Sequence, residues 1–359
     1  MAKTANKGEW SEIYVLFKLL GDKRVYAGDG QLNKIPDIFY PILKILRDEK
    51  EEHYEYSLDQ DIVIVTEDGT EILRKSCKDF LDAALKLLEV MKKAKGTFSV
   101  PFAEDFMNEI HCHSIKACSQ EKADIRIMIH DFRTGMSPTL GFSIKSQVGS
   151  DSTLLNPGKT TNFTFEILGG DYSDKSIEEI NHIDTRTKLM DRYHAIKRFG
   201  SELVFSKVDD RTFSNNLMMI DTCMPQILAA ILIANLETSC NDISRLTKEV
   251  TKKNPLNFDL EENDSFYEHK IKNFLVAVAL GMVPHTPWKG KYEANGGYLV
   301  VKEDGDVLCY HIYDRNLFED YLFYNTRLDK ASSSRYGYAS LYKENNKLKY
   351  KLNLQVRFK

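Results

Sequence analysis

The sequence of 359 residues has no surplus of basic charge, because 49 Lys and Arg side chains stand against 53 Asp and Glu, for a net charge of −4. Binding to nucleic acid through overall basicity is therefore excluded, although a local basic patch on an acidic periphery remains compatible with it. The six cysteines show no framework spacing, and the first ten residues contain no apolar signal core. We therefore expect free thiols and a cytoplasmic protein.

Long apolar runs are also missing. The most apolar segment, residues 218–236, is interrupted by Asp221, Thr222, Pro225 and Gln226, which predicts a buried helix and no membrane association. The sequence contains no G-x-S-x-G element and no Gly-rich loop between a strand and a helix, so neither an α/β-hydrolase nor a nucleotide-binding enzyme is indicated. No internal repeat divides the chain.

The patterns that are present alternate between helix and strand, as is typical of an α/β protein with 42% apolar and 28% charged residues. Helices are predicted at residues 11–20, 34–50, 77–95, 103–114, 177–199, 217–238, 242–252 and 266–280. Strands are predicted at residues 61–66, 124–130, 140–147 and 162–168, and again after residue 296. Boundaries near residues 100 and 215 divide the chain into a mainly helical region 1–100, a central region 101–215 and a helical, then β-rich region 216–359.

Two of the predicted strands form a hairpin that carries one acid and one amine. A turn centred between Thr134 and Gly135 places Asp124 opposite Lys145, and antiparallel partners lie about 4.5–5.5 Å apart. Such a carboxylate can hold Mg²⁺ while the ammonium group stabilises negative charge on a phosphate, which is the chemistry of phosphodiester hydrolysis. The alternative is a cross-strand ion pair worth roughly 0.2–1 kcal/mol, and spacing alone favours that alternative.

Around these residues the sequence resembles a known family. Asp124, followed on the next strand by Ser143-Ile144-Lys145, is similar to the split nuclease signature of an Asp and an acid-x-Lys element. Four longer segments resemble HpaII-type restriction endonucleases and span nearly the whole chain: GEWSEIYVLFKLL from residue 8, GFSIKSQVGSDSTLLNPGKTTNF from residue 141, NTRLDKASSSRYGYASLY from residue 325 and LNLQVRF from residue 352. These segments are far more specific than the short signature alone.

The resemblance implies a restriction-endonuclease-like fold, in which helices flank a mixed β-sheet, with helical insertions and a β-rich C-terminal region. It also implies Mg²⁺-dependent hydrolysis of double-stranded DNA at a short palindrome, CCGG for the family's namesake, leaving 5′-phosphates. Residues 1–100 would then contribute a helix to the active site, residues 101–215 would form the nuclease core, and residues 216–359 would recognise DNA. A palindromic target favours a homodimer, and a monomer that nicks each strand in turn is the alternative.

One departure from the signature concerns the second acid, whose place is taken by Ser143. Serine is a poor Mg²⁺ ligand, so another side chain must complete the metal site. Related nucleases often present an acid from their first helix, which favours Glu12, and Glu166 on a downstream strand is the other acidic candidate. Gln147 lies two residues after Lys145, on the same strand face, and is placed to position a metal-bound water. We therefore expect Asp124 and Glu12 as metal ligands in a catalytic set of Asp124, Lys145, Glu12, Gln147 and Ser143.

Two polar segments are candidates for DNA contact. The first follows the second hairpin strand, and its Lys159 and Asn162 are suited to phosphate oxygens and base edges. The second contains Arg335, which can read guanine O6 and N7 in a CCGG-like site and is preceded by small hydroxyl side chains that can pack on the phosphate backbone. The expected DNA-binding residues are Lys159, Asn162, Ser332, Ser333, Ser334, Arg335 and Arg327.

Two other functions share this pattern. A repair or branched-DNA nuclease would have the same fold and active site, but would not cut plain duplex DNA at one fixed sequence. A non-catalytic DNA-binding protein would account for Ser143 in place of the second acid, whereas the intact Asp124, Lys145 and Glu12 argue against it.

Overall fold

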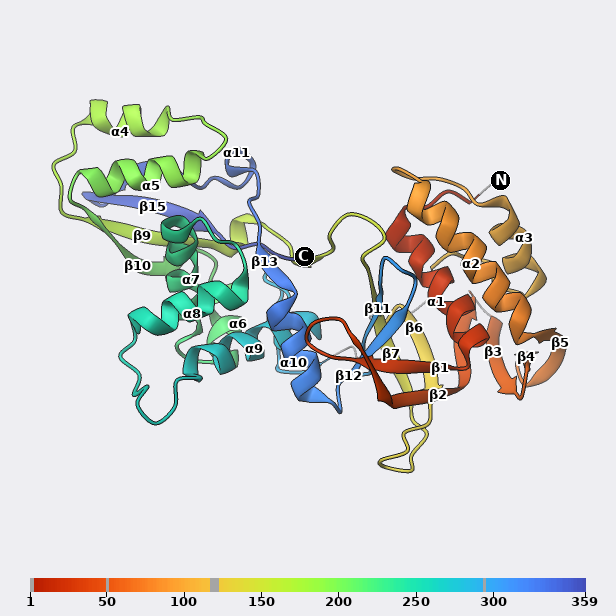
Figure 1. The fold of residues 1–359 in the computed structure, drawn as a ribbon. Coiled ribbons are helices and arrows are strands. Elements are labelled where there is room, and N and C mark those ends of the chain that lie inside the picture. The colour runs from red at the N-terminus through yellow and green to blue at the C-terminus, as the bar shows by residue number, and fades with distance from the viewer. Residues whose placement is uncertain (1–2, 50–51, 117–122, 293–294) are drawn as a thin grey trace. The chain divides into compact units, whose positions relative to one another are not determined.

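The computed structural model describes residues 3–49, 52–116, 123–292 and 295–359, drawn in Figure 1. The chain forms two compact units: unit 1 contains Met1–Ser152 and Tyr292–Tyr321, and unit 2 contains Thr153–Lys291 and Leu322–Lys359. Each unit is built from two separate stretches of chain. The unit boundaries therefore lie at residues 152, 291 and 321, whereas the sequence indicated boundaries near residues 100 and 215.

Unit 1 is built on a mixed sheet of nine strands among the described residues, in the order β1-β12-β11-β7-β6-β2-β3-β4-β5. The strands are β1 (Arg24–Gly28), β2 (Lys34–Glu49), β3 (Glu52–Asp59), β4 (Ile62–Glu67), β5 (Thr70–Ser76), β6 (Ile125–Ile129), β7 (Thr139–Ser146), β11 (Gly297–Val301) and β12 (Val307–His311). β6 pairs antiparallel with β2 on one side and with β7 on the other, whereas β11 runs parallel to β7. Because β11 and β12 come from the second stretch of chain, the sheet joins distant parts of the sequence.

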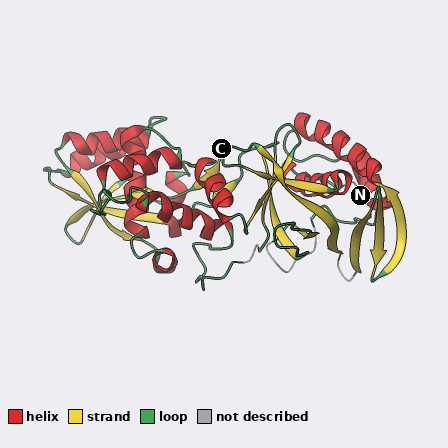
Figure 2. Ribbon diagram, turned by 60° about the horizontal axis from the view of Figure 1, so that its bottom comes forward, coloured by secondary structure: helices red, strands yellow, loops and turns green. Residues whose placement is uncertain are grey.

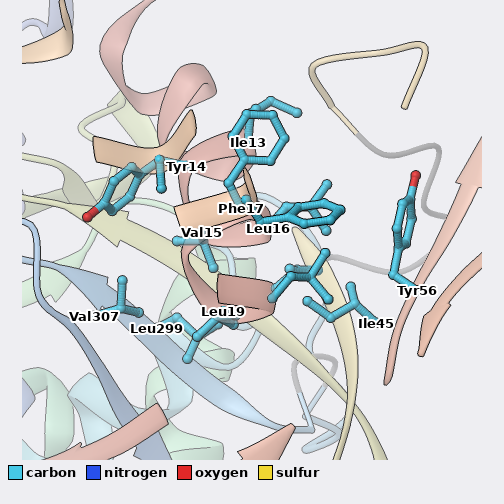
Figure 3. Close-up of a cluster of buried hydrophobic side chains, with 14 of the residues drawn as sticks. Ile13, Tyr14, Val15, Leu16, Phe17, Leu19, Ile45, Tyr56, Leu299 and Val307 are labelled. Atoms are coloured by element: carbon cyan, nitrogen blue, oxygen red, sulfur yellow. The ribbon is translucent and has the colours of Figure 1, made fainter. Parts of the chain in front are cut away.

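One core lies between three helices and one face of this sheet. The helices are α1 (Lys7–Asp22), α2 (Cys77–Lys93) and α3 (Pro101–Glu109). α1 begins at a reciprocal cap, in which the Asn6 side chain accepts from the Glu9 N–H and the Glu9 carboxylate accepts from the Asn6 N–H. Figure 3 shows the buried side chains of α1 together with Ile45 of β2 and Leu299 of β11 in the same core. This packing fixes α1 against the centre of the sheet.

In unit 1 the predicted strands 61–66, 124–130 and 140–147 are present as β4, β6 and β7, whereas β1, β3 and β5 were not predicted. The predicted helices 11–20, 77–95 and 103–114 are confirmed as α1, α2 and α3. The prediction of a helix at residues 34–50 is wrong, because Lys34–Glu49 form the long strand β2. Pro36 and Pro41 explain the error, since proline in a helix interior costs about 3 kcal/mol. Region 1–100 is thus not mainly helical, because β1 to β5 occupy much of it.

The other face of the sheet packs against the start of α10 (Arg315–Tyr324). Phe318 lies edge-on to Tyr298 of β11, with ring centroids 5.3 Å apart, and Tyr321 stacks on Tyr310 of β12 at 4.1 Å. Helices therefore cover both faces of the sheet.

A buried histidine lies at the end of β12. His311 is 1% exposed and stacks on Tyr40. Burial lowers the pKa of His311 to about 4, while the carboxylates of Asp314 and Asp131 act against this. Both carboxylates are themselves paired with Arg133, so they compensate little of the cost of charging the imidazole.

This histidine predicts a loss of stability in acid. An unfolded histidine titrates near pH 6.5. Between about pH 6.5 and 4, this histidine is therefore protonated in the unfolded chain but mostly neutral in the folded protein. As the pH is lowered through this window, the free energy of unfolding should decrease by up to about 3 kcal/mol. We expect the urea midpoint of the wild type to fall more steeply than that of His311→Asn, which has no titrating imidazole there. Parallel pH profiles of the two proteins would contradict this account.

Unit 2 contains two smaller sheets, in the orders β10-β9-β15-β14 and β13-β16-β8. Their strands are β8 (Thr153–Leu155), β9 (Asn162–Leu168), β10 (Glu202–Val208), β13 (Thr326–Leu328), β14 (Leu341–Glu344), β15 (Lys347–Asn353) and β16 (Val356–Phe358). The helices are α4 (Asp174–Asn181), α5 (Lys188–Arg198), α6 (Arg211–Ile220), α7 (Met224–Thr238), α8 (Ile243–Lys253) and α9 (Phe266–Ala279), with the short η1 (Lys159–Thr161) and α11 (Ser333–Tyr336). Figure 2 shows helices and strands in both units, which confirms the predicted mixed α/β class.

The predicted buried helix at residues 217–238 is divided between α6 and α7, and most side chains of α7 are buried. No single helix in the described ranges is long and apolar enough to span a membrane. α6 and α7 reach that length only together, and they are bent by 102°. The five cysteines that the structure describes are free, as predicted, and Cys118 lies outside the described residues.

Candidate active site

The β6–β7 hairpin is present, but its register differs by two residues from the predicted one. Ile125 pairs with Phe142, and this register, continued by one residue, places Ser143 rather than Lys145 opposite Asp124. The reason lies in the turn, where Asp131 bridges Met136, so that the turn is centred one residue earlier than expected. Side chains alternate between the two faces of a sheet, so a shift of two residues leaves Asp124 and Lys145 on the same face.

Asp124 directly precedes β6 and is fixed to the neighbouring strand. Its N–H donates to the Phe142 carbonyl (2.9 Å), and its Oδ2 accepts from the Ile144 N–H (2.6 Å). The residue is half-buried at this strand end. One carboxylate oxygen is thereby committed to β7, which leaves Oδ1 for another ligand.

Lys145 is half-buried on β7. Its Nζ lies 5.0 Å from the centroid of the Tyr298 ring, which belongs to the neighbouring strand β11. Burial lowers the pKa of Lys145, and the negative charge of Asp124 acts against this. Burial and then the Asp124 charge raise the pKa of the Tyr298 hydroxyl. Asp124, Lys145 and Tyr298 therefore share one electrostatic environment.

Glu12 approaches the same carboxylate from α1. Burial raises the pKa of half-buried Glu12 to about 8, and the charge of Asp124 is the second cause. α1 covers the face of the sheet to which Ile144 belongs, whereas Lys145 stands on the other face. Asp124, at the strand end, is the group that interacts with both Glu12 and Lys145.

The pair of Glu12 and Asp124 fits a divalent cation. When both are ionised the two carboxylates repel one another, and a cation between them would relieve that repulsion. Mg²⁺ is commonly held by one or two carboxylates and keeps several waters. In the described ranges, no group of three or more Asp, Glu, His or Cys side chains is arranged to hold a metal. The remaining ligands of an ion at this pair would therefore be water or phosphate oxygens.

Lys116 is a residue of this site that the sequence reasoning missed. Its Nζ pairs with Oε1 of Glu9 at 3.1 Å. The hydrogen bond to Glu9 is the main cause that raises the pKa of Lys116, and the charges of Glu12 and Asp124 raise it further. The residue lies in a loop after α3, where no periodic pattern or motif marked it.

Two other predicted catalytic residues lie on or just beyond β7. Ser143 is half-buried and stands opposite Asp124. Gln147 follows the strand, and its N–H donates to the Val301 carbonyl at 2.8 Å. The backbone of Gln147 is thereby fixed beside β11, close in sequence to Lys145.

The alternative acid Glu166 lies on β9 in unit 2. Its carboxylate pairs with Lys347 at 3.0 Å, so its charge is already matched by a neighbouring strand. Of the two acids considered as replacements for the one missing at Ser143, Glu12 is the one in the same unit as Asp124.

In unit 2, the two segments predicted to contact DNA meet. Lys159 on η1 is exposed, and Arg335 on α11 is exposed with its guanidinium 5.4 Å from the centroid of the Tyr336 ring. A cavity of ≈ 410 Å³ has both Lys159 and Tyr336 in its lining. Ser332 caps α11 by accepting from the Arg335 N–H at 3.4 Å. Two of the three serines, Ser332 and Ser334, are exposed, and Ser333 is half-buried.

Asn162 and Arg327 have environments that the sequence did not indicate. Asn162 is 3% exposed, its Nδ2 donates to the Tyr336 carbonyl (2.9 Å), and its Oδ1 accepts from Asn353 (2.7 Å). Its amide therefore joins the two segments rather than facing solvent, and its contact with DNA stays a prediction. Arg327 is half-buried and pairs with Asp329 at 3.3 Å.

Comparison with known proteins gives one family across both units. The family model described as HpaII restriction endonuclease matches residues 6–358. The chain is similar to the type II restriction enzyme HpaII of Haemophilus parainfluenzae, with 46% identity over 360 residues that cover 99% of this chain and 98% of the relative. No solved structure matches the chain. The matched range contains every predicted site residue.

Proposed function

Because the chain belongs to the HpaII restriction endonuclease family, we propose that it is a Mg²⁺-dependent type II restriction endonuclease that cuts double-stranded DNA at CCGG. Under this proposal the mixed sheet of unit 1 is the sheet of a restriction-endonuclease-like fold. The protein would act in the cytoplasm. A homodimer would match the two-fold symmetry of a palindromic site. Beyond family membership, the observation that carries the proposal is the convergence of Glu12, Asp124 and Lys145 in unit 1.

Asp124 and Glu12 are the residues that would hold Mg²⁺, which when bound polarises a phosphate oxygen and lowers the pKa of a coordinated water. The Ile144 N–H orients Asp124 by holding one of its oxygens. Lys145 would stabilise the negative charge that develops on the scissile phosphate, and its half-buried setting strengthens that interaction relative to water. The Tyr298 ring beside the ammonium group supports its position.

Unit 2 would supply contacts to DNA outside the active site. Exposed Lys159 is suited to a phosphate, and exposed Arg335 is suited to a guanine edge or a phosphate. The hydroxyls of Ser332 and Ser334 are accessible beside Arg335. Asn162 would act indirectly, because its amide holds the two segments together.

Glu12→Gln tests the second metal ligand. The change removes one negative charge from the cation site while keeping the size of the side chain, so the Mg²⁺ concentration for half-maximal cleavage should rise on the order of tenfold or more. Cleavage rates measured over a Mg²⁺ titration give this value. Glu166→Gln is the matched control and should keep the wild-type titration. The reverse result, with Glu166→Gln impaired and Glu12→Gln normal, would transfer the role to Glu166.

Digestion of a fully sequenced plasmid with Mg²⁺, followed by mapping of the ends, tests the proposed activity itself. We expect discrete fragments that end at CCGG and carry 5′-phosphates. Binding of duplex DNA without cleavage in either Mg²⁺ or Mn²⁺ would instead favour the non-catalytic DNA-binding protein. Cleavage confined to branched or damaged DNA would favour a repair nuclease.

A further inference from the structure

Unit 1 contains a cavity that is lined in part by α1 and β7, the elements that carry Glu12 and Lys145. Its volume is ≈ 670 Å³, and three chain segments line it: residues 6–8 at the start of α1, residues 94–97 after α2, and the stretch from Ser146 to residue 152 after β7. α1 and β7 also carry Glu12 and Lys145, so the same two elements contribute to the cavity and to the candidate active site.

The charge of this cavity is positive. The Nζ of Lys7 donates to the Val148 carbonyl at 3.0 Å and to the Lys92 carbonyl at 3.4 Å. These acceptors are neutral, so they fix the ammonium group without cancelling its charge. Lys95 is exposed on another wall of the cavity. Asp151 is the one carboxylate among the lining residues, all of which the structure describes.

The remaining lining is small and polar. A Cβ on Gly149 would lie 3.2 Å from the Cβ of Lys7, so a larger residue would push the segment after β7 away from α1. Glycines and serines leave backbone N–H groups and hydroxyls accessible, and these groups commonly contact DNA phosphates. The first turn of α1 is already capped by Asn6, so the lysines rather than the helix terminus provide the attraction for an anion.

The spacing of Lys7 and Glu12 along α1 is of the same order as the spacing of neighbouring nucleotides in one DNA strand. Lys7 and Glu12 are five residues apart on α1, which is roughly 7.5 Å along the helix axis at about 1.5 Å per residue. A DNA strand advances about 3.4 Å along its axis per nucleotide. Along the axis of α1, Lys7 is thus about two nucleotide steps from Glu12, and Ser146 of the cavity is the neighbour of Lys145 in the chain.

We propose that this cavity binds a phosphate of the cleaved strand next to the scissile one, with Lys7 and Lys95 as its phosphate-contacting residues. The inference rests on the proposed function and adds a binding site to it. Such a contact would hold the strand in register while Lys145 and the two carboxylates act on the neighbouring phosphate, because phosphate contacts position a protein on its duplex.

Lys95→Ala is the test variant, since Lys95 is exposed and the fold does not depend on its side chain. Lys93→Ala is the matched control, because Lys93 is exposed in the last turn of α2 and does not line the cavity. The probe is a 20-base-pair duplex with a central CCGG, bound by the full chain in EDTA at several salt concentrations. We expect Lys95→Ala to reduce the salt slope by about 0.9 and to weaken binding roughly eightfold at 0.1 M salt. Lys93→Ala should match the wild type.

A methylphosphonate scan locates the contact. Neutralising single phosphates within three nucleotides of the cut should weaken wild-type binding at one position beside the scissile phosphate, and Lys95→Ala should show no further loss at that position. Equal salt slopes for Lys95→Ala, Lys93→Ala and the wild type would overturn the proposal, as would an undiminished methylphosphonate effect in Lys95→Ala. If these results accompany normal cleavage of CCGG by the wild type, the cavity assignment alone fails. A wild type that neither binds nor cuts the duplex removes the proposed function as well.

Discussion

Asp124→Asn is expected to reduce cleavage of a CCGG duplex on the order of 10³-fold or more, because it removes the charge of a proposed metal ligand. Among the described residues, Asp124 is the one acid that interacts with both Glu12 and Lys145. The fold should be retained. The amide oxygen of asparagine can still accept from the Ile144 N–H, which is the contact that fixes the strand end. DNA binding in the absence of metal should therefore survive, and the loss should appear in the cleavage step.

Asp304→Asn is the matched control for this change. Asp304 also accepts a backbone N–H, that of Asp306 (2.9 Å), and it lies exposed in the turn between β11 and β12 of the same unit. Single-turnover cleavage, metal-free duplex binding and the urea midpoint are measured for both variants. An Asp124→Asn protein that cuts at the wild-type rate would remove Asp124 from the mechanism. A loss of cleavage together with a collapsed urea midpoint would show a structural role instead.

Lys145→Met has the second largest expected effect. Methionine keeps an unbranched side chain beside Tyr298 but has no charge to place near the phosphate, so cleavage should fall roughly 10²- to 10³-fold at saturating Mg²⁺. The free energy of unfolding should rise or stay unchanged. Burial lowers the pKa of Lys145, which means that the folded protein bears a cost for keeping this ammonium charged, and methionine removes that cost.

Lys44→Met is the control for a charged side chain on the same sheet. Lys44 is half-buried on β2 and pairs with Glu55 at 2.8 Å. It is not one of the proposed catalytic residues. We expect it to cleave normally. Cleavage by Lys145→Met within threefold of the wild type would show that the amine does not act on the phosphate, and a pronounced fall in its urea midpoint would favour the cross-strand ion pair that spacing alone suggested.

The parts of the fold that the sequence predicted are those with local signals. α1 and α2 have apolar residues at helical spacing, and the alternation after Asp124 marks a strand. β2 was predicted wrongly because its apolar spacing resembled a helix, although Pro36 and Pro41 indicated otherwise. The pairing of β7 with β11 joins segments that are far apart in the chain, and no local pattern encodes such a contact.

In the candidate site the predicted register of the hairpin was wrong, whereas the roles of its residues stay predictions. A turn centred one residue earlier than expected brought Ser143 opposite Asp124, and the even shift in register is the reason that Lys145 stayed on the same face. Lys116 could not be predicted, because its contact with Glu9 depends on how a loop returns to α1. Asn162 was chosen for its polar amide, but burial between two loops gives that amide a structural role.

Iron-directed cleavage of the polypeptide is the most direct measurement of where the divalent cation lies. Fe²⁺ replaces Mg²⁺, and ascorbate with peroxide then generates radicals that cut the backbone beside the bound ion. We predict cuts next to Glu12 on α1 and next to Asp124 and Ile144 on the hairpin, all suppressed by excess Mg²⁺ and absent from Asp124→Asn. Cuts that persist unchanged in Asp124→Asn, or that fall only outside these two segments, would contradict the assignment of the metal site.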